Sequence, residues 1–231
     1  KRSLPLLQQL KMNKLLFHII LAIVLVFGSC DKKDDSPSET ITQQNNLPSD
    51  EDPNEGTENF CESVPYPNWT SSPYVLPYPV GKIYTVNLDH CSRSYHAPGQ
   101  PDQYAIDFDM SIGEIITASR EGIVVYIEET GFDGGFPNNL VIIQHEDGTF
   151  AQYMHLTNNG ATVEKGEKVF KGDTIGLSGV TGLAGYPHLH FVVTKAGDFN
   201  YPYESIPYNF SNTIENPKGP QTGIAYEAFP Y

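Results

Sequence analysis

Two histidines separated by one residue lie in the stretch "GYPHLHFVV", residues 185–193. Side chains alternate between the two faces of an extended chain, so His188 and His190 point the same way and Leu189 points the other way. Their β-carbons then lie roughly 6–7 Å apart at the usual strand rise. Two imidazoles at this spacing can both bind one metal ion, or one can bind it while the other acts on an attacking water. The alternative for this stretch alone is a pair of half-buried strand histidines without a chemical role.

The elements that must position these histidines are predicted to be β-strands. Short hydrophobic runs rich in β-branched and aromatic residues are separated by Gly, Asn, Asp and Pro at hairpin spacing, and no amphipathic helical pattern accompanies them. The tripeptide Lys-Gly-acid occurs at 165–167 and again at 171–173, which predicts two tight turns flanking a short strand. We therefore expect an all-β domain with an antiparallel sheet, barrel or sandwich architecture. The predicted strands cover residues 82–88, 103–110, 122–129, 139–145, 149–156 and 188–194.

The N-terminal region has the pattern of an export signal. Lys14 precedes an apolar run over residues 15–27, which is too short to span a bilayer because a spanning helix needs about 20 residues. We expect translation to start at Met12 and residues 1–29 to be a signal peptide. The run ends in Gly-Ser followed by Cys30, which resembles the lipobox of bacterial lipoproteins. The resemblance implies a lipid on Cys30 and an outer-membrane lipoprotein facing the periplasm or the cell surface; the alternative is an ordinary secretory cleavage site.

The cysteine count fits this prediction. An exported protein with three cysteines has one left over after pairing, and a lipid on Cys30 accounts for it. Cys61 and Cys91 then remain as a possible disulfide in an oxidising compartment. The alternative is two free thiols.

The chain after residue 29 divides into three segments of different composition. Residues 30–60 have few large apolar side chains and many Asp, Glu, Asn, Pro and Ser, so they are expected to form a disordered, lipid-anchored linker. Residues 61–200 carry enough apolar sequence for one domain with a hydrophobic core. Residues 201–231 are dense in Tyr, Phe and Pro, and we expect them to pack on that domain as an irregular extension; a substrate-binding rim is the alternative.

The charge excludes one class of partner. The whole sequence has 14 basic and 28 acidic residues. Residues 1–29 contain four of the basic residues and none of the acidic ones, so 10 basic residues face 28 acidic ones in the rest, a formal charge of −18. Such a surface repels nucleic acid and anionic lipid. We expect no nucleic-acid partner, and a membrane contact only through the lipid anchor.

Four segments between residues 104 and 191 carry a combined pattern. They are "YAIDF" (104–108), "GTFAQYMHL" (148–156), "VEKGEKVFKGDTIGLSGVTG" (163–182) and "HLHF" (188–191). Taken together, these segments resemble the lysostaphin/LytM-type zinc endopeptidases, which cut peptide cross-links in bacterial cell walls. The resemblance covers about residues 80–195. It implies an antiparallel β-sheet fold with a metal in a groove, one zinc ion as cofactor, and peptidoglycan peptides as substrate.

The resemblance assigns roles to individual residues. It implies Asp107 and His190 as zinc ligands, with His155 and His188 as catalytic histidines that act on the attacking water and the developing oxyanion. On its expected strand, His155 shares a face with Ala151 and Tyr153, while the flanking Met154 and Leu156 face the core. His145 matches a position where the family often has histidine, and we interpret it as structural; His90 has no assigned role.

The chain departs from the family at one ligand. The family has a histidine four residues before the aspartate, and here that position is Gln103, whose neutral amide is a poor zinc ligand. His96 and Asp102 lie just upstream, on a loop rich in Pro and Gly that can fold back. His96 is therefore our candidate for the third ligand, and the absence of a tight metal site is the alternative.

Two other functions compete with a zinc endopeptidase. The first is a non-catalytic domain of the same type that binds peptidoglycan or regulates another cell-wall hydrolase, and Gln103 is the residue that favours it. The second is a lipoyl- or biotinyl-type carrier module, because "VEKGEKVFKGDTIG" resembles the turns of those domains. Such modules need a modifiable lysine at a hairpin tip with a characteristic neighbour, and Lys165, Lys171 and Lys195 lack that setting. Export also argues against a carrier module.

Overall fold

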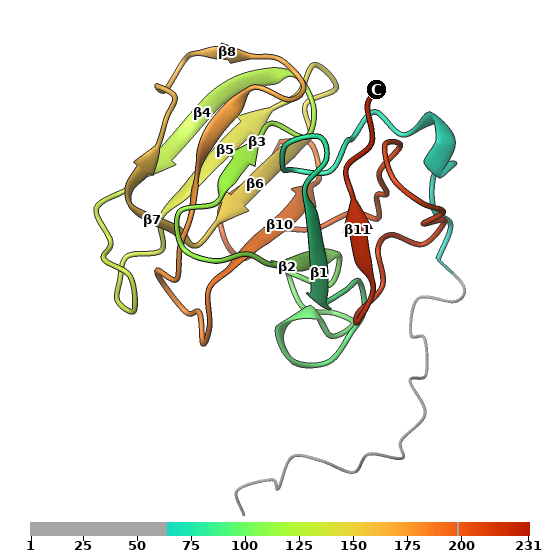
Figure 1. Cartoon of the computed structure of the whole chain (residues 1–231), viewed down its shortest axis with the longest axis horizontal. Helices are drawn as coiled ribbons and strands as arrows, with labels where there is room; N and C mark the ends of the chain where they lie inside the picture. The colour runs from blue at the N-terminus through green and yellow to red at the C-terminus, as the bar shows by residue number, and fades with distance from the viewer. Residues whose placement is uncertain (1–63, 198) are drawn as a thin grey trace, which may run out of the picture. The chain divides into compact units, whose positions relative to one another are not determined.

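The computed structural model describes residues 64–197 and 199–231, and strands dominate this part of the chain (Figure 1). Its helical elements are two single 3₁₀ turns, η2 (Trp69–Ser71) and η3 (Ser94–His96). The all-β prediction is confirmed. The strands are β1 (Ile83–Leu88), β2 (Ala105–Asp109), β3 (Ile115–Thr117), β4 (Gly122–Glu128), β5 (Leu140–Gln144), β6 (Phe150–Met154), β7 (Leu156–Ala161), β8 (Lys168–Val169), β9 (Thr174–Ser178), β10 (His188–Thr194) and β11 (Ala225–Glu227).

The strands form two antiparallel sheets. The larger has eight strands in the order β11-β1-β2-β10-β6-β5-β4-β8, and the smaller has three in the order β3-β9-β7. β10 is an interior strand that pairs with β2 on one side and with β6 on the other, although these strands are far apart in the sequence. This non-local pairing places the His-Leu-His motif beside the aspartate of "YAIDF", as the orange and green strands in Figure 1 show.

Alternation along the interior strands separates a core face from a site face. Leu189 and Phe191 of β10 and Ile106 and Phe108 of β2 belong to the main hydrophobic core, which also includes residues from both sheets. The residues between them point to the opposite face, as the two-residue period of a strand requires. A second, smaller apolar cluster lies on that opposite face. It consists of Ala105, Met154, Val192 and Tyr203, with Leu140 packed against it.

The repeated Lys-Gly-acid tripeptides form turns, as predicted. Residues 165–166 and 171–172 are turns, and the two-residue strand β8 lies between them. Gly166 and Gly172 have φ angles of +92° and +88°, a region in which a β-carbon is disfavoured. The glycine in each tripeptide is therefore what allows the turn to close.

The prediction that His155 shares a strand face with Ala151 and Tyr153 is wrong. Tyr153 and Ala151 lie in the main core and do not share the orientation of His155. The reason is that His155 has a φ of +66°, so strand β6 ends at Met154 and the strict alternation is broken at the histidine. Leu156 faces the core as expected, whereas Met154 lies in the smaller cluster on the other face.

The C-terminal residues complete the domain. Tyr208, Phe210 and Tyr226 are buried in the main core, and β11 adds an edge strand beside β1. The Tyr78 hydroxyl donates a hydrogen bond to the Tyr226 carbonyl over 2.8 Å, which ties the segment to the start of the described chain. Residues 201–231 thus contribute core side chains as well as surface.

Several predictions concern residues outside the described part. These are the signal peptide over residues 1–29, the lipid on Cys30, the linker over residues 30–60, and the partner role of Cys61. Cys91 is disulfide-bonded. None of the helices within residues 64–197 and 199–231 reaches the length and hydropathy that a membrane span requires.

Candidate active site

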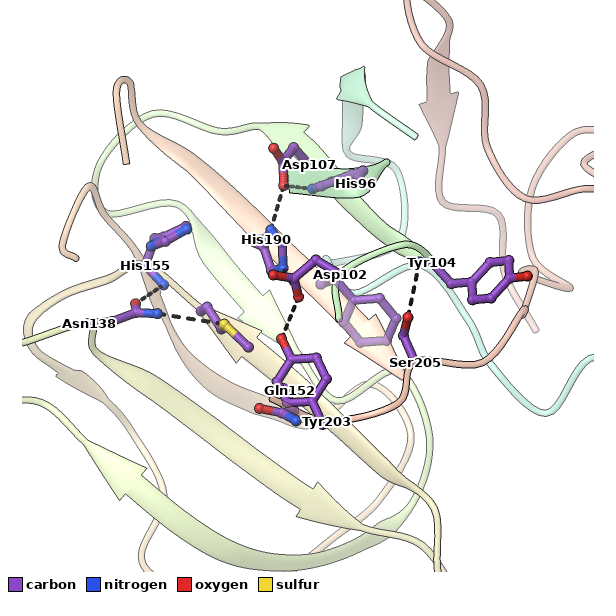
Figure 2. Close-up of polar contacts among 12 residues, drawn as sticks. His96, Asp102, Tyr104, Asp107, Asn138, Gln152, His155, His190, Tyr203 and Ser205 are labelled. Atoms are coloured by element: carbon purple, nitrogen blue, oxygen red, sulfur yellow. Dashed lines mark hydrogen bonds and ion pairs between the residues drawn. The ribbon is translucent and has the colours of Figure 1, made fainter. Parts of the chain in front are cut away.

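Asp107 and His190 meet across the centre of the large sheet. They are direct cross-strand partners in the β2–β10 ladder, and both point to the site face. The Nδ1 atom of His190 lies 2.8 Å from Oδ1 of Asp107. Both side chains are buried, and the register between β2 and β10 brings them together (Figure 2).

His96 reaches the same carboxylate from the loop between β1 and β2. The loop folds back on itself because the Cys91 amide donates to the Gln103 carbonyl over 2.7 Å. His96, at the end of η3, is buried, with Nε2 3.5 Å from Oδ1 of Asp107. Its Nδ1 atom lies 3.2 Å from the Asp89 carbonyl, which can only accept a hydrogen bond, so Nδ1 carries the proton and Nε2 is directed at the site.

Gln103 does not take part in this cluster. Its Oε1 atom accepts a hydrogen bond from the Gly99 amide over 2.7 Å, and its Nε2 atom donates to the Cys91 sulfur over 3.5 Å. The amide therefore braces the loop that carries His96. The structure thus places His96, and not the residue at the usual family position, beside Asp107 and His190.

Within the described part of the chain, two overlapping groups of side chains have the donor atoms and the spacing to hold a metal ion. One is His96, Asp107 and His190; the other is His155, His188 and His190, and in each group the ligand atoms lie within 4.8 Å of one another. Only the first includes a carboxylate. Two imidazoles and one carboxylate make a donor set that suits zinc, and three protein ligands leave a further position open for water or substrate.

The two remaining histidines are fixed by main-chain carbonyls. Nδ1 of His155 lies 2.7 Å from the Thr181 carbonyl, and Nδ1 of His188 lies 2.8 Å from the Tyr186 carbonyl. A carbonyl only accepts, so each Nδ1 carries a proton and each neutral ring presents the lone pair of Nε2. The two ring centroids are 4.7 Å apart, and both rings are buried. This pair can accept a proton from a water that approaches the metal-binding group.

Asp107 and His190 carry opposite charges that stabilise each other. Burial alone would raise the pKa of Asp107, but hydrogen bonds and charge interactions with His190 and His96 hold it well below its usual range. Burial alone would lower the pKa of His190, but its bonds to Asp102 and Asp107 raise it to about 10. Asp107 is therefore a carboxylate at neutral pH, and the positive charge of His190 balances it.

The pKa values of His155 and His188 are lowered, in contrast to that of His190. Burial lowers the pKa of His155 to about 3, and the nearby His190 and His188 add to this effect. Burial also lowers the pKa of His188, although the Asp107 charge opposes it. Both rings are thus neutral near pH 7 and are proton acceptors.

Sequence patterns did not identify two residues that support the site. The Asn138 side-chain oxygen accepts a hydrogen bond from the His155 amide over 3.0 Å and so holds the left-handed backbone at that histidine. The Tyr203 hydroxyl donates to Asp102, which in turn faces His190. Neither residue lies in a motif, and only the tertiary contacts connect them to the site; Figure 2 shows both contacts.

The other two histidines of the described chain lie outside the site. Nδ1 of His145 is 2.8 Å from the Glu121 carbonyl, and Nδ1 of His90 is 3.0 Å from the Tyr66 hydroxyl. Both rings are buried among aromatic side chains. His145 therefore has the structural contacts of a core residue, and His90 packs under the C-terminal segment beside Tyr208.

Comparison with known proteins identifies relatives of this chain. Residues 101–202 match the model of Peptidase family M23. The chain is 34% identical over 122 residues to the peptidoglycan DD-endopeptidase ShyA of Vibrio cholerae, a match covering 52% of this chain and 27% of that protein. It is 34% identical over 109 residues to the glycyl-glycine endopeptidase ALE-1 of Staphylococcus capitis, covering 46% of this chain and 29% of the relative. The matches thus span less than a third of these two relatives.

A solved structure of lysostaphin from Staphylococcus simulans is also similar. It shares 28% sequence identity over 53% of this chain and 47% of the lysostaphin chain, with a TM-score of 0.41. The segments matched by the family model contain Asp107, His155, His188 and His190, whereas His96 lies before its first residue. Over residues 101–202, which are less than half of the chain, the sequence is therefore similar to peptidase family M23.

Proposed function

We propose that this protein is a zinc-dependent endopeptidase that cleaves the peptide cross-links of peptidoglycan. The observation that carries the proposal is the convergence of His96, Asp107 and His190 on one point beside the paired acceptors His155 and His188. His96 supplies the imidazole that the chain lacks at Gln103. The names of two relatives, a peptidoglycan DD-endopeptidase and a glycyl-glycine endopeptidase, support cell-wall peptides as the substrate class.

The donor set of His96, Asp107 and His190 fits a zinc ion. Once bound, zinc would polarise the scissile carbonyl and make a nearby water more acidic. The contacts of His96 with Asp89 and of His190 with Asp107 orient the rings in advance. The site therefore needs little rearrangement of its side chains.

The proton is handled by His155 and His188. The Thr181 and Tyr186 carbonyls keep the Nδ1 protons in place, so the lone pair at Nε2 of either ring accepts the proton of the attacking water. A ring that has taken this proton becomes a donor, and it can then stabilise the oxyanion or protonate the leaving amine. Both rings are buried, so the proton that one of them takes up is not lost to bulk water before it reaches the leaving amine.

The proposal extends to the location of the protein. We infer that a lipid on Cys30 anchors the chain to the outer membrane and that residues 30–60 link this anchor to the domain. The supporting observation is the Gly-Ser-Cys sequence directly after an apolar run of signal-peptide length. An anchored domain facing the periplasm or the cell surface would have its substrate within reach.

Metal analysis of the purified protein tests the function. We expect one zinc ion per chain, release of peptide fragments from purified peptidoglycan, and loss of that release with a chelator. His190→Ala and His96→Ala each leave at most two protein ligands, so both should remove zinc. His145→Asn changes a buried histidine outside the site and serves as the matched control that retains zinc.

Two results would contradict the proposal. Full zinc occupancy in His190→Ala and in His96→Ala would overturn the ligand set. A folded, zinc-free protein that binds peptidoglycan without cleaving it would establish the alternative, a non-catalytic binding or regulatory domain.

A further inference from the structure

The ring of His190 contacts a carboxylate at each of its nitrogens. Nδ1 faces Asp107, and Nε2 lies 3.3 Å from Oδ1 of Asp102. The same Asp102 oxygen accepts a hydrogen bond from the Tyr203 hydroxyl. Figure 2 shows the chain of contacts running from Asp107 through His190 and Asp102 to Tyr203. Asp102 thus bonds to the side of the imidazole that faces away from Asp107.

Tyr203 is held firmly in this position. Its ring is buried in the smaller apolar cluster with Ala105, Met154 and Val192, three residues from the strands around His190. Ser205, two residues further on, forms a β-bridge with Thr194 of β10. Its hydroxyl also accepts a hydrogen bond from the amide of Tyr104, just before β2, over 3.2 Å. The C-terminal segment therefore orients the Tyr203 hydroxyl through packing and main-chain contacts.

A carboxylate on the distal nitrogen of a ligand imidazole has a known physical effect. It holds the proton on that nitrogen, leaves the lone pair on the other, fixes the plane of the ring and increases its basicity. On the basis of the function proposed above, we propose that Asp102, oriented by Tyr203, is a positioning residue that holds His190 for zinc binding through Nδ1. Asp102 acts through His190 and contacts neither substrate nor metal.

This arrangement gives the C-terminal segment a role in the site. The family match ends at residue 202, one residue before Tyr203. The hydroxyl that orients Asp102 thus comes from sequence outside the matched region. Zinc affinity in this chain depends on that segment in a way that its M23 motifs do not predict.

Zinc dissociation constants of four full-length variants test the proposal, measured by competition with a chelator of known affinity. Removal of such an outer contact typically costs 10–100-fold in metal affinity, and we expect this loss for Asp102→Ala. Asp102→Asn keeps an acceptor without the charge and should lose less. Tyr203→Phe keeps the ring and should weaken zinc binding several-fold. The double variant Asp102→Ala/Tyr203→Phe should be no weaker than Asp102→Ala, because Tyr203 acts only through Asp102.

Tyr78→Phe is the control, because it removes a tyrosine hydroxyl that is buried in the main hydrophobic core and bonded to the Tyr226 carbonyl. It should bind zinc as the unmodified chain does. Wild-type zinc affinity in Asp102→Ala would overturn the proposal, and additive losses in the double variant would overturn the link through Tyr203. If Asp102→Ala does not fold, Tyr203→Phe and Asp102→Asn decide the outcome by the same measurement. A wild-type chain that binds no zinc would instead contradict the proposed function itself.

Discussion

At the scale of residues, the site consists of histidines whose tautomers are set by their neighbours. Main-chain carbonyls bind Nδ1 of His96, His155 and His188, so all three rings direct Nε2 into the site. His190 is the exception, because carboxylates face both of its nitrogens. The hydrogen-bond partner of one ring nitrogen thus decides whether the other nitrogen of a histidine presents a lone pair or a proton.

His155→Ala and His188→Ala should separate catalysis from metal binding. Neither histidine belongs to the group of His96, Asp107 and His190, so both variants should retain zinc. Peptide release from peptidoglycan should fall by about 10²–10⁴-fold, the usual contribution of a general acid–base group. Zinc content and release rate are measured on the same samples. Loss of zinc from either variant would place that histidine among the ligands.

The buried, neutral His145 should make stability depend on pH. Burial lowers its pKa to about 4, whereas an unfolded histidine titrates near 6.5. The unfolded state therefore takes up the proton first as pH falls, so this stabilising contribution is complete above about pH 6.5 and is lost between about pH 6.5 and 4. The full effect is about 3 kcal/mol, since each pKa unit corresponds to about 1.4 kcal/mol.

His145→Asn keeps a donor for the Glu121 carbonyl but cannot titrate. Its free energy of unfolding, measured with denaturant from pH 7 to pH 4.5, should fall less steeply than that of the unmodified chain. Equal slopes would mean that His145 is not the group responsible.

At the scale of elements, the connection between β9 and β10 positions His155 and His188, the two proposed catalytic histidines. It supplies the Thr181 carbonyl to His155 and the Tyr186 carbonyl to His188. The connection begins at Gly179, where an added β-carbon would lie 2.3 Å from the Thr157 amide nitrogen. Close contact between these two backbones is thus possible only with glycine at this position.

Gly179→Ala should therefore force the connection away from β7. We expect a loss of about 1–3 kcal/mol in stability, the usual cost of overpacking, together with reduced peptide release and retained zinc. Gly185→Ala is the matched control on the same connection, because an added β-carbon there meets nothing within 4 Å. Thermal melts and release assays compare the two, and indistinguishable variants would contradict the role given to Gly179.

At the scale of the whole molecule, the proposed anchor and the proposed metal site have separate sequence requirements. The anchor depends on Cys30, while every proposed site residue lies between His96 and Tyr203. In cells that process lipoproteins, Cys30→Ser should move the protein from the membrane fraction to the soluble fraction and abolish incorporation of labelled fatty acid. Its zinc content should not change. Continued fatty-acid labelling of the Cys30→Ser protein would refute lipidation at this position.

The sequence by itself determined the local features of this protein. Strand periodicity and turn glycines predicted the all-β class and the turns around β8, because these depend on neighbouring residues. Alternation placed His188 and His190 on one face of a strand, and the family resemblance added Asp107 and His155. The resemblance also revealed that Gln103 occupies a ligand position, which made His96 a candidate.

Only the tertiary structure decided which side chains meet. The left-handed backbone of His155 depends on the hydrogen bond that its amide donates to Asn138. The loop that brings His96 to Asp107 is closed by the bond from the Cys91 amide to the Gln103 carbonyl. The contact of Tyr203 with Asp102 joins positions 101 residues apart, and no local pattern encodes it. Periodicity records which face a residue takes along its own strand, whereas the partner across the sheet or at the end of a loop is fixed by packing of the whole domain.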